Sequence, residues 1–212
     1  DILKSAKSAD RTLSCGFSSS ENSYLHPVSA AAQLPSLQNI LTVKRMPGFP
    51  MSTASPFSPA HSPDGLTGRG IGVAVLDTGI FPHIDFGSRI RAFCDFTKGK
   101  TGPYDDNGHG THVAGILGGS GQMSGGILSG IAPLCRFVIV KVLDQKGEAN
   151  VASILAGLKW VEMNHRKYKI RIVNLSAGAG KNLEPGKEKM LIEAVEHLWD
   201  LGLVVVVSSG NN

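Results

Sequence analysis

Residues 71–79 read IGVAVLDTG, an apolar run that ends in Asp77, Thr78 and Gly79. A continuous apolar run, rather than an alternating one, is typical of a strand that is buried on both faces of a parallel sheet. The polar residues at its end predict a loop at the carboxyl end of that strand. The stretch therefore predicts an inner strand with Asp77 at the edge of the sheet where ligands usually bind.

Strands and helices alternate after this stretch. Apolar runs at residues 136–143, 170–175 and 203–207 predict further strands, and residues 151–165 and 187–201 predict helices between them. Alternation of this kind is typical of an α/β domain. We expect a three-layer, doubly wound and mostly parallel sheet, covered by helices on both faces.

The first 67 residues have a different character. They hold seven of the eleven prolines and many serines, and their hydrophobic periodicity is poor outside a short predicted helix at 27–41. Such a composition buries too little apolar surface to offset the entropy of ordering the chain. We expect residues 1–67 to form an extended or partly disordered N-terminal extension, with a propeptide remnant as the alternative, and residues 68–212 to form the folded portion.

The composition excludes several classes of partner. The chain is 42% hydrophobic and 18% charged with a net charge of +4, but its basic residues form no run and do not alternate with aromatic ones. We therefore expect no nucleic-acid binding. No segment approaches the roughly 18 apolar residues of a membrane span, so we expect no membrane association.

Three widely spaced cysteines, Cys15, Cys94 and Cys135, do not form the even set of a disulfide framework. We expect Cys94 and Cys135 to be small buried hydrophobic residues. Free thiols favour a reducing compartment, which indicates the cytoplasm, with secretion as the alternative.

A second polar motif, NGHGTHVAG at residues 107–115, places His109 and His112 among small residues at the start of a predicted helix. The spacing could suit zinc, but the glutamate of H-E-x-x-H and a nearby cysteine pair are both absent. The acidic residues before it, Asp105 and Asp106, lack the spacing of an EF-hand, which favours a solvated turn over a calcium loop.

Four motifs in order resemble the subtilisin-like serine peptidases, and most of all the bacterial intracellular alkaline protease type. They are DTG at 77–79, HGTHVAG at 109–115, NLSAG at 174–178 and SSGN at 208–211. The resemblance covers about residues 68–212. It implies a serine-type endopeptidase that hydrolyses peptide bonds through an Asp/His/Ser triad.

The resemblance implies a role for each matched residue. His112 is expected to be the general base and acid, oriented by Asp77, with Asn211 as a donor to the oxyanion. His109 is expected to fix the local turn rather than to join catalysis. An extended polypeptide substrate is expected to bind between two flanking segments. These segments are Ser176, Ala177 and Gly178 on one side and Gly147, Glu148 and Ala149 on the other.

The family's nucleophilic serine lies in a Gly-Thr-Ser turn, and no such sequence occurs in this chain. We therefore expect a fragment that is inactive alone and that lacks the C-terminal segment of its own domain, with apolar sheet faces left uncovered. A non-catalytic peptide-binding pseudoprotease and a structural domain with relic motifs are the alternatives. The chemistry requires no cofactor, and the resemblance allows a structural calcium ion at an unknown site.

Overall fold

The structure, a computed structural model, describes residues 65–177 and 185–208. Three of the sequence predictions lie outside these residues: the N-terminal extension up to residue 64, Gly178 and Asn211.

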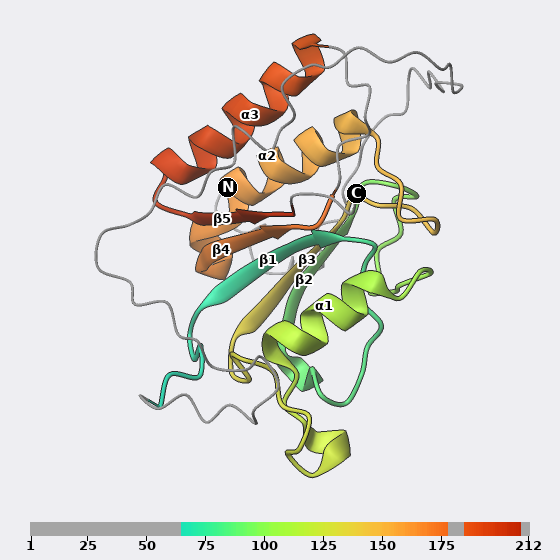
Figure 1. Ribbon diagram of the computed structural model, residues 1–212, viewed down its shortest axis with the longest axis vertical. Helices are drawn as coiled ribbons and strands as arrows, with labels where there is room; N and C mark the ends of the chain where they lie inside the picture. The colour runs from blue at the N-terminus through green and yellow to red at the C-terminus, as the bar shows by residue number, and fades with distance from the viewer. Residues whose placement is uncertain (1–64, 178–184, 209–212) are drawn as a thin grey trace, which may run out of the picture.

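Five parallel strands form one sheet in the order β2-β3-β1-β4-β5 (Figure 1). The strands are β1 (Gly72–Asp77), β2 (Ile90–Asp95), β3 (Arg136–Lys141), β4 (Ile170–Leu175) and β5 (Val204–Val207). Every residue of β1 is buried, as the continuous apolar run predicts. The chain adds strands first on one side of β1 and then on the other, which makes β1 the switch point of a doubly wound sheet.

Strand β2 is absent from the sequence predictions. Its sequence, IRAFCD, breaks the apolar run with Arg91 and Asp95, and four of its six residues are only partly buried or exposed. A strand near the edge of the sheet does not need the continuous apolar pattern on which the prediction relied. The four predicted strands are confirmed.

Helices cover both faces of the sheet (Figure 1). Helix α1 (His109–Gly118) packs on one face, and helices α2 (Val151–Tyr168) and α3 (Pro185–Asp200) pack on the other. Two separate apolar clusters result, one around Phe137 on the α1 side and one around Leu158 on the α2 side. The predicted three-layer architecture is confirmed. None of the described helices is long and apolar enough to cross a membrane.

Strand β5 leaves part of the sheet uncovered in the described residues. Val204 is 46% exposed and Val206 is 50% exposed, although their neighbours in the strand are partly buried. Alternate side chains of a strand point to opposite faces. One apolar face of β5 is therefore open, as we expect for a domain that is covered incompletely.

The cysteines differ from the prediction. Cys135 is a free and fully buried thiol, and burial raises its pKa to about 11. Cys94 is buried too, but it is disulfide-bonded, so the expected free thiol at this position is wrong. The argument from unpaired cysteines for the cytoplasm is therefore lost. A cytoplasmic location stays a prediction that rests on the resemblance to the intracellular protease type.

Candidate active site

The candidate site is built on Asp77, the last residue of β1. Its side chain is fully buried, and the backbone N–H of Thr78 donates to Asp77 Oδ1 over 2.6 Å. Because β1 lies inside the sheet, the carboxylate is held by a rigid element rather than by a loop. A buried carboxylate needs further donors to offset the loss of water.

The second partner of Asp77 is His109, the first residue of α1. His109 Nδ1 lies 2.8 Å from Asp77 Oδ1 and 3.0 Å from Asp77 Oδ2. An ionised carboxylate only accepts hydrogen bonds, so this contact places the proton on Nδ1 and leaves Nε2 of the neutral ring as an acceptor. The His109 side chain is 51% exposed, and no hydrogen bond reaches its Nε2 within the described residues. The arrangement can take up a proton from a group that approaches from solvent.

The prediction that His112 pairs with Asp77 is wrong. His112 lies one helical turn further along α1, and its exposed side chain makes no hydrogen bond or ion pair within the described part of the chain. The helix begins at His109, so of the two histidines only this one lies where α1 meets the end of β1. His112 lies about 4.5 Å further along the helix axis. In this structure only the His109 ring makes the contact with Asp77.

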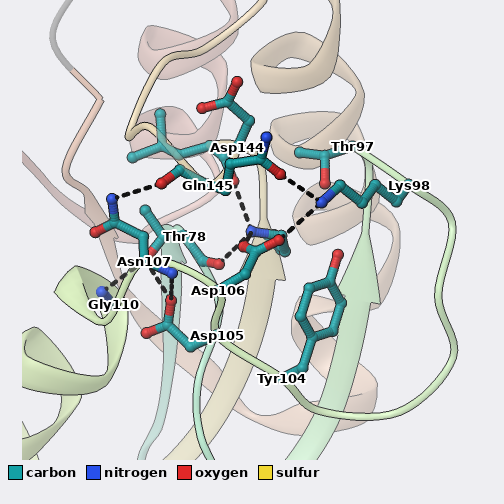
Figure 2. A network of polar contacts seen from close by, with 12 residues as sticks. Thr78, Thr97, Lys98, Tyr104, Asp105, Asp106, Asn107, Gly110, Asp144 and Gln145 are labelled. Atoms are coloured by element: carbon teal, nitrogen blue, oxygen red, sulfur yellow. Dashed lines mark hydrogen bonds and ion pairs between the residues drawn. The ribbon is translucent and has the colours of Figure 1, made fainter.

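Asp105 fixes the start of α1 against the end of β1 (Figure 2). Its Oδ1 accepts from the Thr78 hydroxyl and from the backbone N–H of Gly108, at 2.9 Å and 2.8 Å. Its Oδ2 accepts from the backbone N–H of Thr111 over 2.9 Å and from the Thr111 hydroxyl. A carboxylate is favourable there because the first N–H groups of a helix have no partners within the helix. Although burial would raise the pKa of Asp105, hydrogen bonds from Thr111 and from the loop backbone lower it.

The two glycines beside His109 have different roles: Gly110 allows α1 to approach β1 closely, and Gly108 allows an unusual backbone angle. A Cβ atom on Gly110 would lie 2.2 Å from the backbone oxygen of Gly79 and 3.1 Å from Asp77 Oδ1. The Gly110 N–H donates to the Thr78 hydroxyl over 2.9 Å. Gly108, on the other side of His109, adopts a φ of 102° that favours glycine. Glycines directly flanking His109, and not His112, are the sequence signal that distinguishes the two histidines.

One of the predicted substrate-flanking segments follows β4. The Ser176 N–H donates to the carbonyl of Leu76 over 3.2 Å, and the Ser176 hydroxyl accepts from Asn174 Nδ2 over 2.8 Å. Ala177 is buried. These residues therefore lie beside the end of β1, at the same edge of the sheet as Asp77.

The other predicted segment, Gly147 to Ala149, belongs to a turn between β3 and α2. Asp144 closes the turn, because its N–H donates to the Glu148 carbonyl over 2.9 Å and its Oδ1 accepts from the Glu148 N–H over 3.0 Å. Ala149 forms an isolated antiparallel bridge with Leu143. The segment is thus a short hairpin at the carboxyl end of β3, next to β1 in the sheet.

The described residues contain no group of three or more His, Cys, Asp or Glu side chains placed to hold a metal ion. Asp105 and Asp106, weighed above as a calcium loop, instead bond to protein donors. A calcium ion elsewhere stays a prediction.

Comparison with known proteins shows the family of the chain. The sequence pattern of the Subtilase family matches residues 68–212, which is most of the chain. The chain belongs to the Subtilase family. This subtilase is 43% identical over 151 residues to serine protease AprX of Bacillus subtilis (strain 168), covering 69% of the chain and 34% of that relative. It is 41% identical over 155 residues to subtilisin Savinase of Lederbergia lenta, covering 73% of the chain and 53% of that relative.

A solved structure shows the same fold. The crystal structure of a cold adapted subtilisin-like serine proteinase superposes with a TM-score of 0.57 at 31% identity, covering 69% of this chain and 48% of the other. The chain thus spans between a third and about half of the length of the relatives it matches.

Proposed function

We propose that the protein is a serine-type endopeptidase in which Asp77 and His109 form the acid–base half of a catalytic triad. The observation that carries this proposal is the hydrogen bond from His109 Nδ1 to the buried Asp77 carboxylate, with Nε2 left open toward solvent. His109 Nε2 takes the proton of the nucleophilic serine and later returns it to the leaving amine. Asp77 holds the required tautomer and stabilises the imidazolium that forms.

The polypeptide substrate binds as an extended strand between the segment after β4 and the hairpin of residues 143–149. The hairpin uses the N–H groups of Gly147 and Glu148 and the carbonyl of Glu148 for its own turn. Within the described residues, the carbonyl of Gly147 is left to accept from a substrate N–H. Main-chain bonding of this kind binds substrate independently of its side chains.

The serine comes from a part of the protein outside residues 1–212. No serine hydroxyl contacts His109 in the described residues, and the hydroxyl of Ser176 already accepts from Asn174. Asn211, the proposed oxyanion donor, lies outside the described residues. We therefore expect residues 1–212 to be inactive by themselves.

Labelling and hydrolysis test this function together. The complete protein that contains residues 1–212 should hydrolyse casein and take up one equivalent of a serine-directed phosphonylating reagent, with loss of activity. Residues 1–212 alone should do neither. A complete protein that binds an extended peptide saturably, yet cuts nothing and takes no label, would show a pseudoprotease instead.

A further inference from the structure

A fully buried lysine lies at the carboxyl end of β3, next to the candidate site. The Lys141 side chain has no exposed surface, and its Nζ donates to Asp106 Oδ1, to the Thr78 carbonyl and to the Leu143 carbonyl. The three distances are 2.8, 2.5 and 2.9 Å. An ammonium group has three N–H donors, so each of them has one acceptor.

The three acceptors belong to three segments that the proposed function uses. Thr78 directly follows Asp77, Asp106 precedes His109 by three residues, and Leu143 begins the hairpin beside the substrate. One ammonium group therefore connects the chain segments of the acid, the base and the substrate-binding hairpin. Figure 2 shows these segments converging around Asp106.

Lys98 continues the connection on the outer side of Asp106. Its Nζ lies 2.9 Å from Asp106 Oδ2 and 2.7 Å from the side-chain oxygen of Gln145 in the hairpin. Asn107 Nδ2 also donates to the Gln145 carbonyl over 3.1 Å. Although burial would raise the pKa of Asp106, hydrogen bonds from Lys141 and Lys98 lower it to about 2. The bridging carboxylate is thus ionised at neutral pH.

Stability alone does not explain a charge at this position. Burying an ammonium group is unfavourable, and replacing a buried ion pair by apolar side chains of similar volume is often neutral or stabilising. What an apolar side chain cannot do is hold three chain segments at fixed hydrogen-bond distances. The face of the Tyr104 ring, 5.1 Å from Lys141 Nζ, further fixes the ammonium group.

We propose that Lys141 and Asp106 act as a positioning pair that sets the His109 loop against both Asp77 and the substrate-binding hairpin. The proposal rests on the proposed peptidase function. Neither residue touches the reacting atoms. They act through the placement of His109 and of the hairpin, and catalysis is sensitive to such placement, since a shift of about 1 Å can cost roughly 10²-fold in rate.

The pair is tested by measuring kcat and KM of variants of the complete protein. The rates are expressed per active site, which is counted by titration with a phosphonylating reagent. Lys141→Met should lower kcat roughly 10²-fold on a short anilide and on an extended peptide. Asp106→Asn should do the same to a smaller extent and remains informative if Lys141→Met does not fold. Lys98→Met should mainly raise KM for the extended peptide, because Lys98 contacts Asp106 and the hairpin but not Thr78.

The matched control is Lys159→Met, which removes an ion pair to Glu162 on the surface of α2. It should leave kcat and KM unchanged on both substrates. The double variant of Lys141→Met and Asp106→Asn should lose no more than Lys141→Met alone, because the two residues act as one unit. If the pair only stabilised the fold, each variant would lower the fraction of folded protein and nothing else. Active-site titration corrects for that fraction, so such a variant would show an unchanged kcat per titrated site.

Two results would overturn the positioning role while leaving the peptidase intact. One is an unchanged kcat per titrated site in both single variants, with activity still lost in His109→Ala. The other is full additivity in the double variant. If no variant or wild type cuts peptide, the low-field NMR resonance of the His109–Asp77 proton decides instead. It should weaken in Asp106→Asn and stay in Lys159→Met, and its persistence in both would contradict the pair.

Discussion

At the scale of single residues, the orientation of one imidazole ring determines the chemistry. The His109 ring places Nδ1 on a buried carboxylate and leaves half of its side-chain surface open. Residue types at the site could be predicted from the sequence, since Asp77 follows a buried apolar run. The choice between two histidines three residues apart was missed, although only His109 has glycine on both sides. What those glycines mean becomes clear only from the backbone path that brings the start of α1 against β1.

Asp106 should give the protein a specific sensitivity to acid. Its pKa in the fold, about 2, lies below the ordinary value of about 3.9. A lowered pKa means that the ionised form stabilises the fold above about pH 4, and that this contribution is lost as pH falls toward 2. The difference in unfolding free energy between wild type and Asp106→Asn should therefore shrink from pH 5 to pH 2 in denaturant titrations. A constant difference over this range would contradict the prediction.

At the scale of elements, the site depends on how closely the start of α1 approaches the loop after β1. Asp105 accepts from both sides of this contact, and Gly110 lies against the backbone of Gly79. The packing of backbone against backbone thus determines where the catalytic side chains lie. That packing explains the glycine after His109, and the φ of 102° at Gly108 explains the glycine before it.

Gly110→Ala should destabilise the fold and lower kcat, because its Cβ would overlap the Gly79 backbone and crowd Asp77. Overpacking of this kind typically lowers the unfolding free energy by about 1–3 kcal/mol. Gly115→Ala is the matched control in the same helix, since a Cβ there meets nothing within 4 Å. It should stabilise the helix by up to about 1 kcal/mol. Equal effects of the two variants on thermal unfolding would refute the close approach.

At the scale of the whole molecule, periodicity predicted the layers and most of the strands. It missed β2, whose Arg91 and Asp95 interrupt the apolar pattern, because a less buried strand follows a weaker rule. It also gave no sign of the role of Lys141. A charge inside the run VIVKVL appears as a defect until its acceptors are known: Leu143 in the same run, and Thr78 and Asp106 on two other segments. Periodicity carries no information about contacts between segments that are distant in the sequence.

The Asp77–His109 pair is tested most directly by replacing each histidine in the complete protein and measuring kcat on a peptide substrate. His109→Ala should reduce kcat by about 10⁶, the magnitude known for loss of the histidine in a subtilisin triad. His112→Ala should keep most of the activity, because its exposed side chain bonds to no described residue. Activity that survived His109→Ala and disappeared in His112→Ala, with both proteins folded, would contradict the assignment.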